Sequence, residues 1–114
     1  FNMPFQSPER FAEQRDRVRA ACTTIGRDPE SLVYSTAQVV CIGRNDAEIA
    51  RRAAAIGRDV DELKQNGLCG TPAEALQKIA DWGALGVSRL YLQFLDLSDL
   101  DHIELVGSEI IPHL

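Results

Sequence analysis

The sequence predicts an α/β fold in which parallel strands alternate with helices. Residues 67–96 contain a helical pattern, a glycine turn and then a short apolar run, which is the order of elements in an α/β unit. A second run rich in β-favouring residues, 32–42, is also followed by a helical pattern. Both faces of each run are mostly apolar, as expected for parallel strands that are covered on two sides. The chain therefore combines two predicted strands with their covering helices.

The first helix is expected to begin after Ser7 and to end at Gly26. Ser7 can cap it, and Pro8 suits the first helical position, because the amide that proline lacks would have no partner there. Charged residues occupy the outer face, which is typical of a solvated surface. The buried stripe is expected to consist of Phe11, Val18, Cys22 and Ile25.

Caps and glycines also delimit the helices after the first predicted strand. Asn45 can cap a second helix, which Gly57 ends. The polar segment 58–66 can hold a short helix that is capped by Asp59 or Asp61. We expect this segment to be the most mobile part of the chain.

The unit at residues 67–96 carries the clearest local signals. Thr71, Pro72 and Glu74 match a capping box with proline at the first helical position. Trp82 on this helix is expected to be half-buried against a neighbouring helix. In the strand that follows, one face is expected to present Leu90, Leu92 and Phe94, and the other Tyr91, Gln93 and Leu95.

A terminal helix is predicted from about residue 98 to residue 111, with Asp96 as its cap. His102 has acidic neighbours in this pattern and is expected at the surface. The inward stripe is expected to consist of Leu100, Ile103, Val106 and Ile110.

The composition is that of an ordinary globular domain, with 45% hydrophobic and 25% charged residues. A formal net charge of −5 without a basic stripe argues against a nucleic-acid surface. No apolar run approaches the ~18 residues of a membrane-spanning helix, so we expect a cytoplasmic protein without membrane contact. The cysteines Cys22, Cys41 and Cys69 are odd in number and widely spaced, which fits reduced, buried thiols better than a disulfide framework or a zinc site.

The run G-T-P-A-E-A-L, its helix, the run L-G-V-S-R-L-Y-L-Q and the ending L-D-L-S-D-L-D-H follow one another in residues 70–102. Their order and spacing resemble the C-terminal end of luciferase-like oxidoreductases, most closely the actinobacterial branch that uses the deazaflavin coenzyme F-420. The resemblance extends over residues 1–114. It implies one α/β segment, the C-terminal portion of a (β/α)8 TIM barrel, with two βα units and a preceding helix.

A complete barrel of this kind needs ~250 residues, whereas this chain has 114. The resemblance therefore implies an incomplete barrel. The chain also begins with Phe1 rather than Met, which we interpret as a processed, truncated or partly observed product.

Barrel active sites lie at the carboxyl ends of the strands, which here means Gly43 and Arg44 after one strand and Gln93 and Asp96 at the other. Gly43 can let a ligand approach the backbone, Arg44 can pair with a phosphate or carboxylate, and Gln93 can hydrogen-bond a flavin-like ring. The simpler interpretation, which we favour, is a turn glycine and a surface arginine, with Asp96 as a helix cap. The resemblance adds Asn2, near the barrel mouth. The candidate cofactor-binding residues are thus Asn2, Gly43, Arg44 and Gln93, with no catalytic residue and no metal ligand predicted.

The resemblance implies a parent enzyme that transfers a hydride between coenzyme F-420, or FMN as second choice, and an organic small-molecule substrate. Much of the cofactor contact in this family comes from upstream strands, so we expect the 114 residues alone to be catalytically inactive. Whether they bind a cofactor by themselves stays open. Two parallel strands leave exposed edges. We therefore expect pairing with the remainder of the barrel or self-association into a homo-oligomer.

Two other classes of protein stay open. The first is a non-catalytic α/β module that self-associates and buries Leu90, Leu92, Phe94 and residues 33–39. The second is a different small α/β enzyme, which would require a convergent set made of Gln38, Arg44, Gln93 and Asp96.

Overall fold

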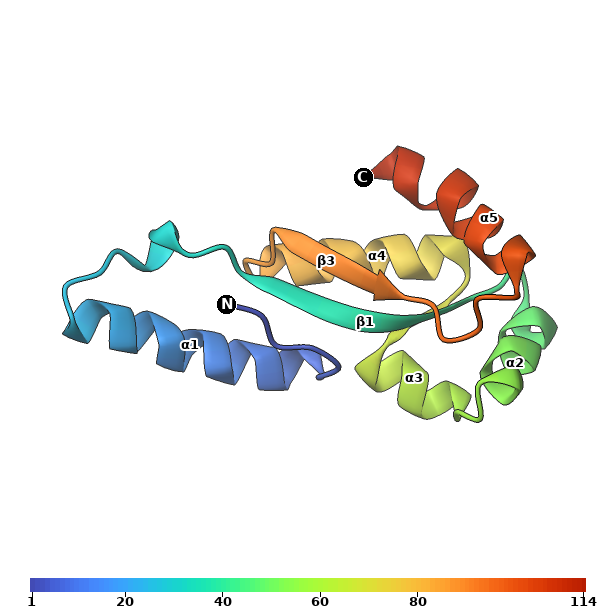
Figure 1. Ribbon diagram of the computed structural model, residues 1–114, viewed down its shortest axis with the longest axis horizontal. Helices are drawn as coiled ribbons and strands as arrows, with labels where there is room; N and C mark the ends of the chain where they lie inside the picture. The colour runs from blue at the N-terminus through green and yellow to red at the C-terminus, as the bar shows by residue number, and fades with distance from the viewer.

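The computed structural model describes residues 1–114 and has an elongated shape, with principal extents of 50 × 27 × 22 Å (Figure 1). Its helices and strands follow the order α1 (Pro8–Thr24), β1 (Ser35–Ile42), α2 (Asp46–Ala55), α3 (Val60–Asn66), β2 (Leu68–Gly70), α4 (Pro72–Ala84), β3 (Arg89–Gln93) and α5 (Leu100–Glu109). Short 3-10 helices lie at Pro29–Ser31 and Ile111–His113. None of the helices combines the length and the hydrophobicity that crossing a membrane requires. The predicted mixed α/β class is confirmed.

Three parallel strands form the sheet in the order β2–β1–β3, so β1 is central. β3 pairs with residues 35–39 of β1, and β2 pairs with residues 40–42. The two strands therefore cover different parts of the length of β1.

The N-terminal segment, residues 1–5, extends the edge of β1 that β2 occupies. The amide of Phe5 donates to the carbonyl of Ala37 at 2.8 Å. The amide of Gly43, which has the same odd parity along the strand, donates to the carbonyl of Gly70 at 3.1 Å. The backbone N–H and C=O groups of odd-numbered residues point to one edge of a strand, and those of even-numbered residues to the other. β1 therefore has the N-terminal segment and then β2 on one edge, and β3 on the other.

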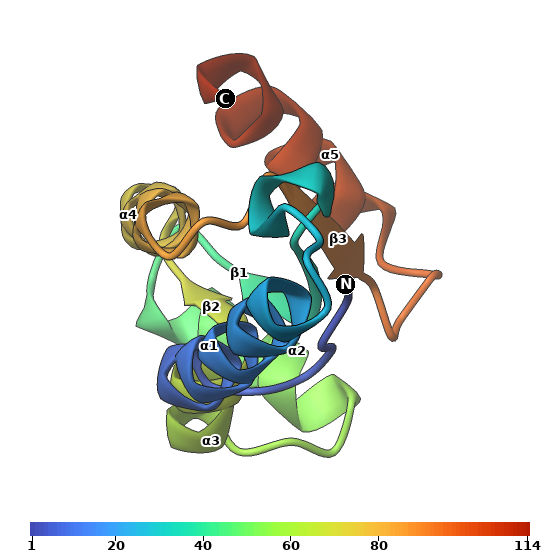
Figure 2. The same ribbon diagram turned by 90° about the vertical axis from the view of Figure 1, so that its left-hand side faces the viewer.

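Helices cover the two faces of the sheet unequally. On one face, α4 and α5 pack against Val40 and Ile42. On the other face, α2 and α3 pack against Val39 and Cys41, near the end of β1 only. No helix lies over β3 on this second side (Figures 1 and 2). We call this uncovered side the open face; its residues are Ala37, Val39, Tyr91, Gln93 and Leu95.

The predicted helix starts are confirmed, because they depend on local hydrogen bonds. In the capping box of α4, the Thr71 hydroxyl accepts the amide of Glu74 at 3.3 Å, and the Glu74 carboxylate accepts the amide of Thr71 at 3.1 Å. The side chains that cap α1, α2 and α3 are Ser7, Asn45 and Asp59. Gly86, whose φ is 94°, follows the end of α4 as expected.

The prediction of only two strands is wrong, because residues 68–70 form a third. β2 is three residues long and lies between glycines, so its local pattern is that of a turn. Its buried Leu68 and Cys69 are held by pairing with the end of β1. This strand is therefore specified by its neighbour rather than by its own sequence.

The predicted cap of the terminal helix is also wrong, and its inward face is confirmed for Val106 and Ile110 only. Asp99 caps α5 by accepting the amide of His102 at 3.1 Å, whereas Asp96 accepts a bond from the Ser98 hydroxyl at 2.6 Å. His102 is 5% exposed, so it is not a surface residue. Two residues expected inside are exposed, namely Leu100 and Ile103. The buried residues are His102, Leu105, Val106 and Ile110.

Smaller differences concern the ends of elements and one aromatic ring. β1 begins at Ser35 rather than at residue 32, and Val33 is exposed. Ile25 is exposed because it lies past the last residue of α1. Trp82 packs against a neighbouring helix as expected, but it is fully buried, with its ring edge-to-face on Phe11 at a centroid distance of 5.4 Å.

Candidate functional site

The last residue of β1, Ile42, is buried and has no strand beside it on the β3 edge, because the pairing with β3 ends at Val39. Two side chains take the place of a strand. The amide of Ile42 donates to Nε2 of His102 at 2.9 Å, and its carbonyl accepts a bond from Nη1 of Arg52 at 3.0 Å. A buried peptide group without a partner costs about as much as a lost hydrogen bond. His102 and Arg52 therefore stabilise the carboxyl end of the central strand.

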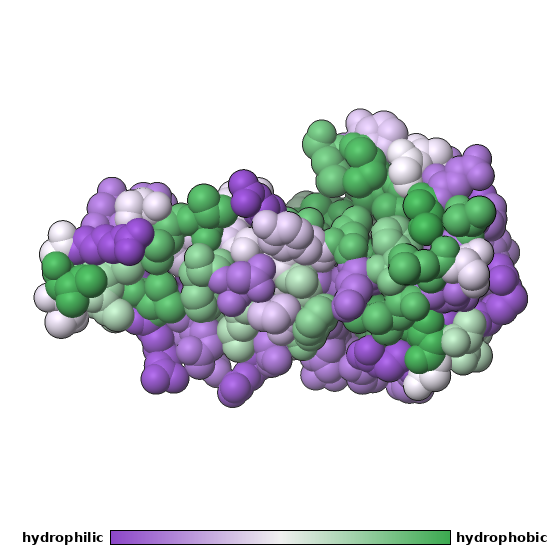
Figure 3. All heavy atoms as spheres, viewed as in Figure 1, coloured by the Kyte–Doolittle hydropathy of each residue, from purple (hydrophilic) through white to green (hydrophobic).

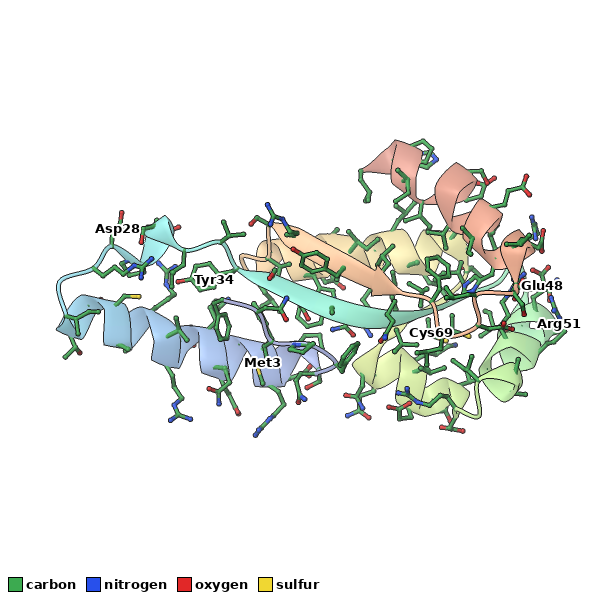
Figure 4. The ribbon with its side chains drawn as sticks, in the orientation of Figure 1. Met3, Asp28, Tyr34, Glu48, Arg51 and Cys69 are labelled. Atoms are coloured by element: carbon green, nitrogen blue, oxygen red, sulfur yellow. The ribbon has the colours of Figure 1, made fainter.

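Arg52 is only 3% exposed and lies at the centre of a charged cluster between α2 and α5. Its guanidinium contacts Asp99 at 2.9 Å, Asp101 at 3.0 Å and Glu48 at 2.9 Å. Figure 4 shows Glu48 on α2, beside the start of α5. The hydrogen bond from Arg52 holds the pKa of Asp99 below its ordinary value. A buried guanidinium is tolerated because several groups compensate its charge.

His102 is kept neutral by its surroundings. Burial, and then the positive charge of Arg52, hold the pKa of His102 below its ordinary value. Three carboxylates oppose this shift without reversing it, those of Asp96, Asp99 and Asp101. The neutral ring is the form that fits, because Nε2 must accept the bond from Ile42. The ring also packs edge-to-face on Phe94 at a centroid distance of 5.1 Å.

A hollow of ≈ 280 Å³ lies on the open face, at the carboxyl end of β3 and beside Val39 of β1. Val39 and Gln93 are direct neighbours across the sheet at this point. The lining residues are Phe5, Val39, Arg58, Asn66, Gln93 and Leu95. Apolar walls with a few amides and a cation are typical of small-molecule sites. Figure 3 looks onto this side of the molecule and shows hydrophobic residues gathered toward the strand ends and α5.

Two lining residues are held in specific geometries. Phe5 has a φ of 60°, and it is the one residue other than glycine with a positive φ. This conformation costs an L-residue roughly 1–2 kcal/mol, and such strain is concentrated at functional sites. Arg58 forms a two-pronged pair with Glu62, with distances of 2.8 and 3.1 Å, which orients its guanidinium at the rim of the hollow.

The structure does not bring the four predicted site residues together. Asn2 lies beside the first residue of β1, where its side chain donates to the Ser35 hydroxyl at 2.8 Å. A side chain at Gly43 would meet the backbone of Ile49 at 2.8 Å, so this glycine permits the close approach of α2. Arg44 is exposed and pairs with Glu48 and Asp101 rather than with the hollow, at 3.3 and 3.5 Å. A role for these three residues in cofactor binding stays a prediction.

Gln93 is the predicted residue that lines the hollow. The alternative set of a small α/β enzyme does not converge, because Gln38 is opposite Leu92 and so lies on the other face of the sheet. The amide nitrogen of Gln38 donates to the carbonyl of Gln6 at 3.3 Å, a contact with the N-terminal segment. Asp96 lines a separate small pocket beside Arg52.

Sequence reasoning missed five of the lining residues, namely Phe5, Val39, Arg58, Asn66 and Leu95. Arg58 and Asn66 delimit the polar segment that the pattern marks between two helices. Val39 is one of many apolar strand residues and carries no distinguishing signal. Its neighbour Gln93 identifies it only once the register of β1 and β3 is known.

The sequence matches no known protein-family model and no curated protein sequence. Solved structures do match. An F-420-dependent secondary alcohol dehydrogenase, in complex with an F-420–acetone adduct, aligns with a TM-score of 0.74 and 12% identity, over 96% of this chain and 41% of that chain. The coenzyme F-420-dependent tetrahydromethanopterin reductase from Methanopyrus kandleri aligns with a TM-score of 0.71 and 16% identity, over 98% of this chain and 45% of that chain.

A third similar structure is the monooxygenase RslO1 from Streptomyces bottropensis, with a TM-score of 0.61 and 19% identity, over 98% of this chain and 41% of that chain. At these identities the likeness concerns the fold alone. The 114 residues span less than half the length of each of these proteins. The chain therefore has the fold of a part of these oxidoreductases.

Replacing Arg52 is expected to destabilise the fold far more than replacing its neighbour on α2. Arg52→Ala leaves the Ile42 carbonyl and the Asp99 carboxylate without their partner, which should lower the free energy of unfolding by about 3–5 kcal/mol. Arg51→Ala is the matched control, because Arg51 is exposed and should change stability by less than about 0.5 kcal/mol. Urea unfolding measures both variants. Equal effects would contradict the role of the buried cluster.

The lowered pKa of His102 predicts a loss of stability in mild acid. An unfolded histidine takes up a proton below about pH 6.5, whereas folded His102 resists protonation. The unfolded chain then binds more protons, so the free energy of unfolding should fall by about 1 kcal/mol per pH unit below that pH. Asp99 acts at lower pH, because its lowered pKa gives a contribution that is present above about pH 4 and lost below it.

The measurement is urea unfolding at pH 7.5 and at pH 5.5. His102→Gln keeps an acceptor for the Ile42 amide but cannot be protonated, and it should remove most of the difference between the two conditions. His113→Gln, at the exposed C-terminal end, should retain the difference. A pH dependence that follows His113 rather than His102 would show the assignment to be wrong.

Proposed function

We propose that residues 1–114 form the C-terminal part of a (β/α)8 barrel in a luciferase-like oxidoreductase, and that the open face is one wall of its cofactor and substrate pocket. The observation that carries this proposal is the hollow beside Gln93, the last residue of β3, because barrel active sites lie at the carboxyl ends of the strands. The fold shared with part of two F-420-dependent enzymes and a monooxygenase supports the same proposal.

The arrangement of strands also supports a partial barrel. The N-terminal segment, β1 and β3 lie side by side in parallel, with α1 and α4 as the connections between them. In a barrel each strand pairs with the next one along the chain. β2 pairs with the last three residues of β1, on the edge where the N-terminal segment pairs with the first ones. In the chain, α2 and α3 form an insertion between β1 and β2. Further strands would pair with the free edge of β3 and close over the open face.

The lining of the hollow fits a flat heterocycle with polar edges. Phe5, Val39 and Leu95 offer apolar contact to a ring and exclude water from its faces. The amides of Gln93 and Asn66 can donate to and accept from ring oxygen and nitrogen atoms. Coenzyme F-420, or FMN as second choice, would supply hydride transfer when bound. The chain's own residues would bind and orient the ring, and the remaining contacts would come from the rest of the barrel.

This proposal is tested by titrating the isotope-labelled chain with coenzyme F-420 and, separately, with FMN, while backbone amide resonances are followed by NMR. We expect weak binding, because one wall of a pocket is present, and no hydride transfer. The resonances of Phe5, Val39 and Gln93 should shift together. Gln93→Ala should weaken binding about two- to tenfold, which corresponds to the ~0.5–1.5 kcal/mol of one hydrogen bond.

Gln77→Ala is the matched control, because Gln77 is an exposed amide on α4, away from the open face. It should bind as the unchanged chain does. Resonance shifts confined to α1, or no shifts at saturating cofactor, would contradict the assignment of the hollow as the cofactor-binding site. Shifts with FMN but not with F-420 would transfer the proposal to the flavin branch.

A second candidate function, a self-association module, is favoured by one observation. β3 has an unpaired edge, and Tyr91 on β3 and Leu95 just after it are exposed. Leu92 and Phe94, which the sequence suggested would be buried by self-association, already pack against the core of the chain. A homo-oligomer would therefore bury the open face.

Sedimentation over a range of concentrations tests this alternative. A self-associating chain should form a reversible dimer or larger oligomer, and Leu95→Lys should shift the equilibrium toward monomer by placing a charge on the open face. Ile25→Lys is the control, because Ile25 is exposed at the end of α1 instead. A single monomeric species at every concentration would exclude the self-association module.

A further inference from the structure

Cys41 and Cys69 lie directly opposite each other on β1 and β2. Both thiols are free and belong to the same apolar cluster, so both side chains lie on the same face of the sheet. Neighbouring strands are ~4.8 Å apart, which is within the range of roughly 4.4–6.8 Å between the Cα atoms of disulfide-bonded cysteines. Cys22 is as buried as Cys69, at 6% exposure each, but lies on α1 in a different part of the chain.

We propose that Cys41 and Cys69 are a redox pair, which a low-molecular-weight disulfide oxidises to a disulfide bond between β1 and β2. In the first step the Cys69 thiolate attacks one sulfur of the small disulfide, and a mixed disulfide forms as one small thiolate leaves. In the second step the Cys41 thiolate attacks the Cys69 sulfur and displaces the second small thiolate. The two protein thiols lose two electrons, the small disulfide gains them, and the two protons end on the two small thiols.

The surroundings of the pair make this reaction slow. Cys69 is slightly exposed and Cys41 is fully buried, so Cys69 is the entry point for the reagent. A hydrogen bond with Cys41, and then burial, raise the pKa of the Cys69 thiol, whereas the same hydrogen bond lowers the pKa of Cys41. The thiolate is therefore scarce at Cys69, the sulfur that the reagent can reach, until the contact between the two cysteines opens. Figure 4 shows Cys69 in the interior, near the end of β1 and beside α2 and α3. Oxidation should therefore require local opening of these short helices and should accelerate as pH rises.

The disulfide would also affect the hollow, because each cysteine is close in the sequence to a residue that lines it. Val39 lies two residues before Cys41, and Asn66 lies three residues before Cys69. Both line the hollow, from β1 and from the end of α3. A bond between the two cysteines would tie these two walls together.

The experiment treats the folded chain with hydroxyethyl disulfide, quenches with acid, and maps the peptides by mass without reduction. We expect a Cys41–Cys69 cross-link that dithiothreitol reverses. Cys22 in the same molecule is the internal control, because it lies on α1 without a cysteine opposite it and should form no cross-link within the chain. Cys41→Ala should stop the reaction at a mixed disulfide on Cys69, whereas Cys22→Ala should form the cross-link at the rate of the unchanged chain.

Cys41 is buried, so Cys41→Ala also removes core packing, and the peptide map of the unchanged chain decides by itself. A stable mixed disulfide on Cys69 without a cross-link, or a cross-link that includes Cys22, would overturn the proposal. So would a cross-link that forms only in urea, since it would then belong to the unfolded chain.

Discussion

The peptide group of Ile42 imposes the constraint on which much of this structure depends. It is buried at the end of the central strand, three residues beyond Val39, the last residue of β1 that pairs with β3. Another strand residue would normally satisfy such a group, but here Arg52 and His102 do so from two different helices. Each must then be buried, the one with compensating carboxylates and the other in its neutral form. This requirement adds to the apolar packing that holds α2 and α5 against β1.

This constraint explains which parts of the fold the sequence could predict. The caps of α1 to α4 are confirmed because each depends on residues within four positions of one another. The cap of α5 is different, since Asp96 and Asp99 are both suitable locally. Asp99 is the cap in the structure, where its carboxylate also meets Arg52, a residue 47 positions away. A local pattern carries no information about such a partner. For the same reason Leu100 and Ile103 are exposed against expectation, whereas Val106 and Ile110 are buried as expected.

The candidate site shows the same division between local and distant information. Gln93 could be proposed because it is a polar residue in an apolar strand, at the end where ligands bind. Its companion Val39 depends on the register between β1 and β3, and Phe5 depends on an unusual backbone conformation in the N-terminal segment. Gly43 and Arg44 have suitable residue types at the correct strand end. Contacts with α2 and α5 account for both, through steric fit in one case and ion pairs in the other.

The unpaired edge of β3 connects the fold to the proposed function. Closing this edge with a second copy and closing it with further barrel strands satisfy the same backbone groups, so hydrogen bonding alone does not favour either. The open face distinguishes them, because it combines exposed apolar side chains with polar residues around a hollow. A flat interface with a second copy would bury Gln93 and the rim of the hollow without new partners, at a cost in desolvation. Barrel strands would curve away and keep the hollow as a cavity, in which those polar groups can bind a ligand. The polar lining is therefore the reason to prefer the barrel over the self-association module.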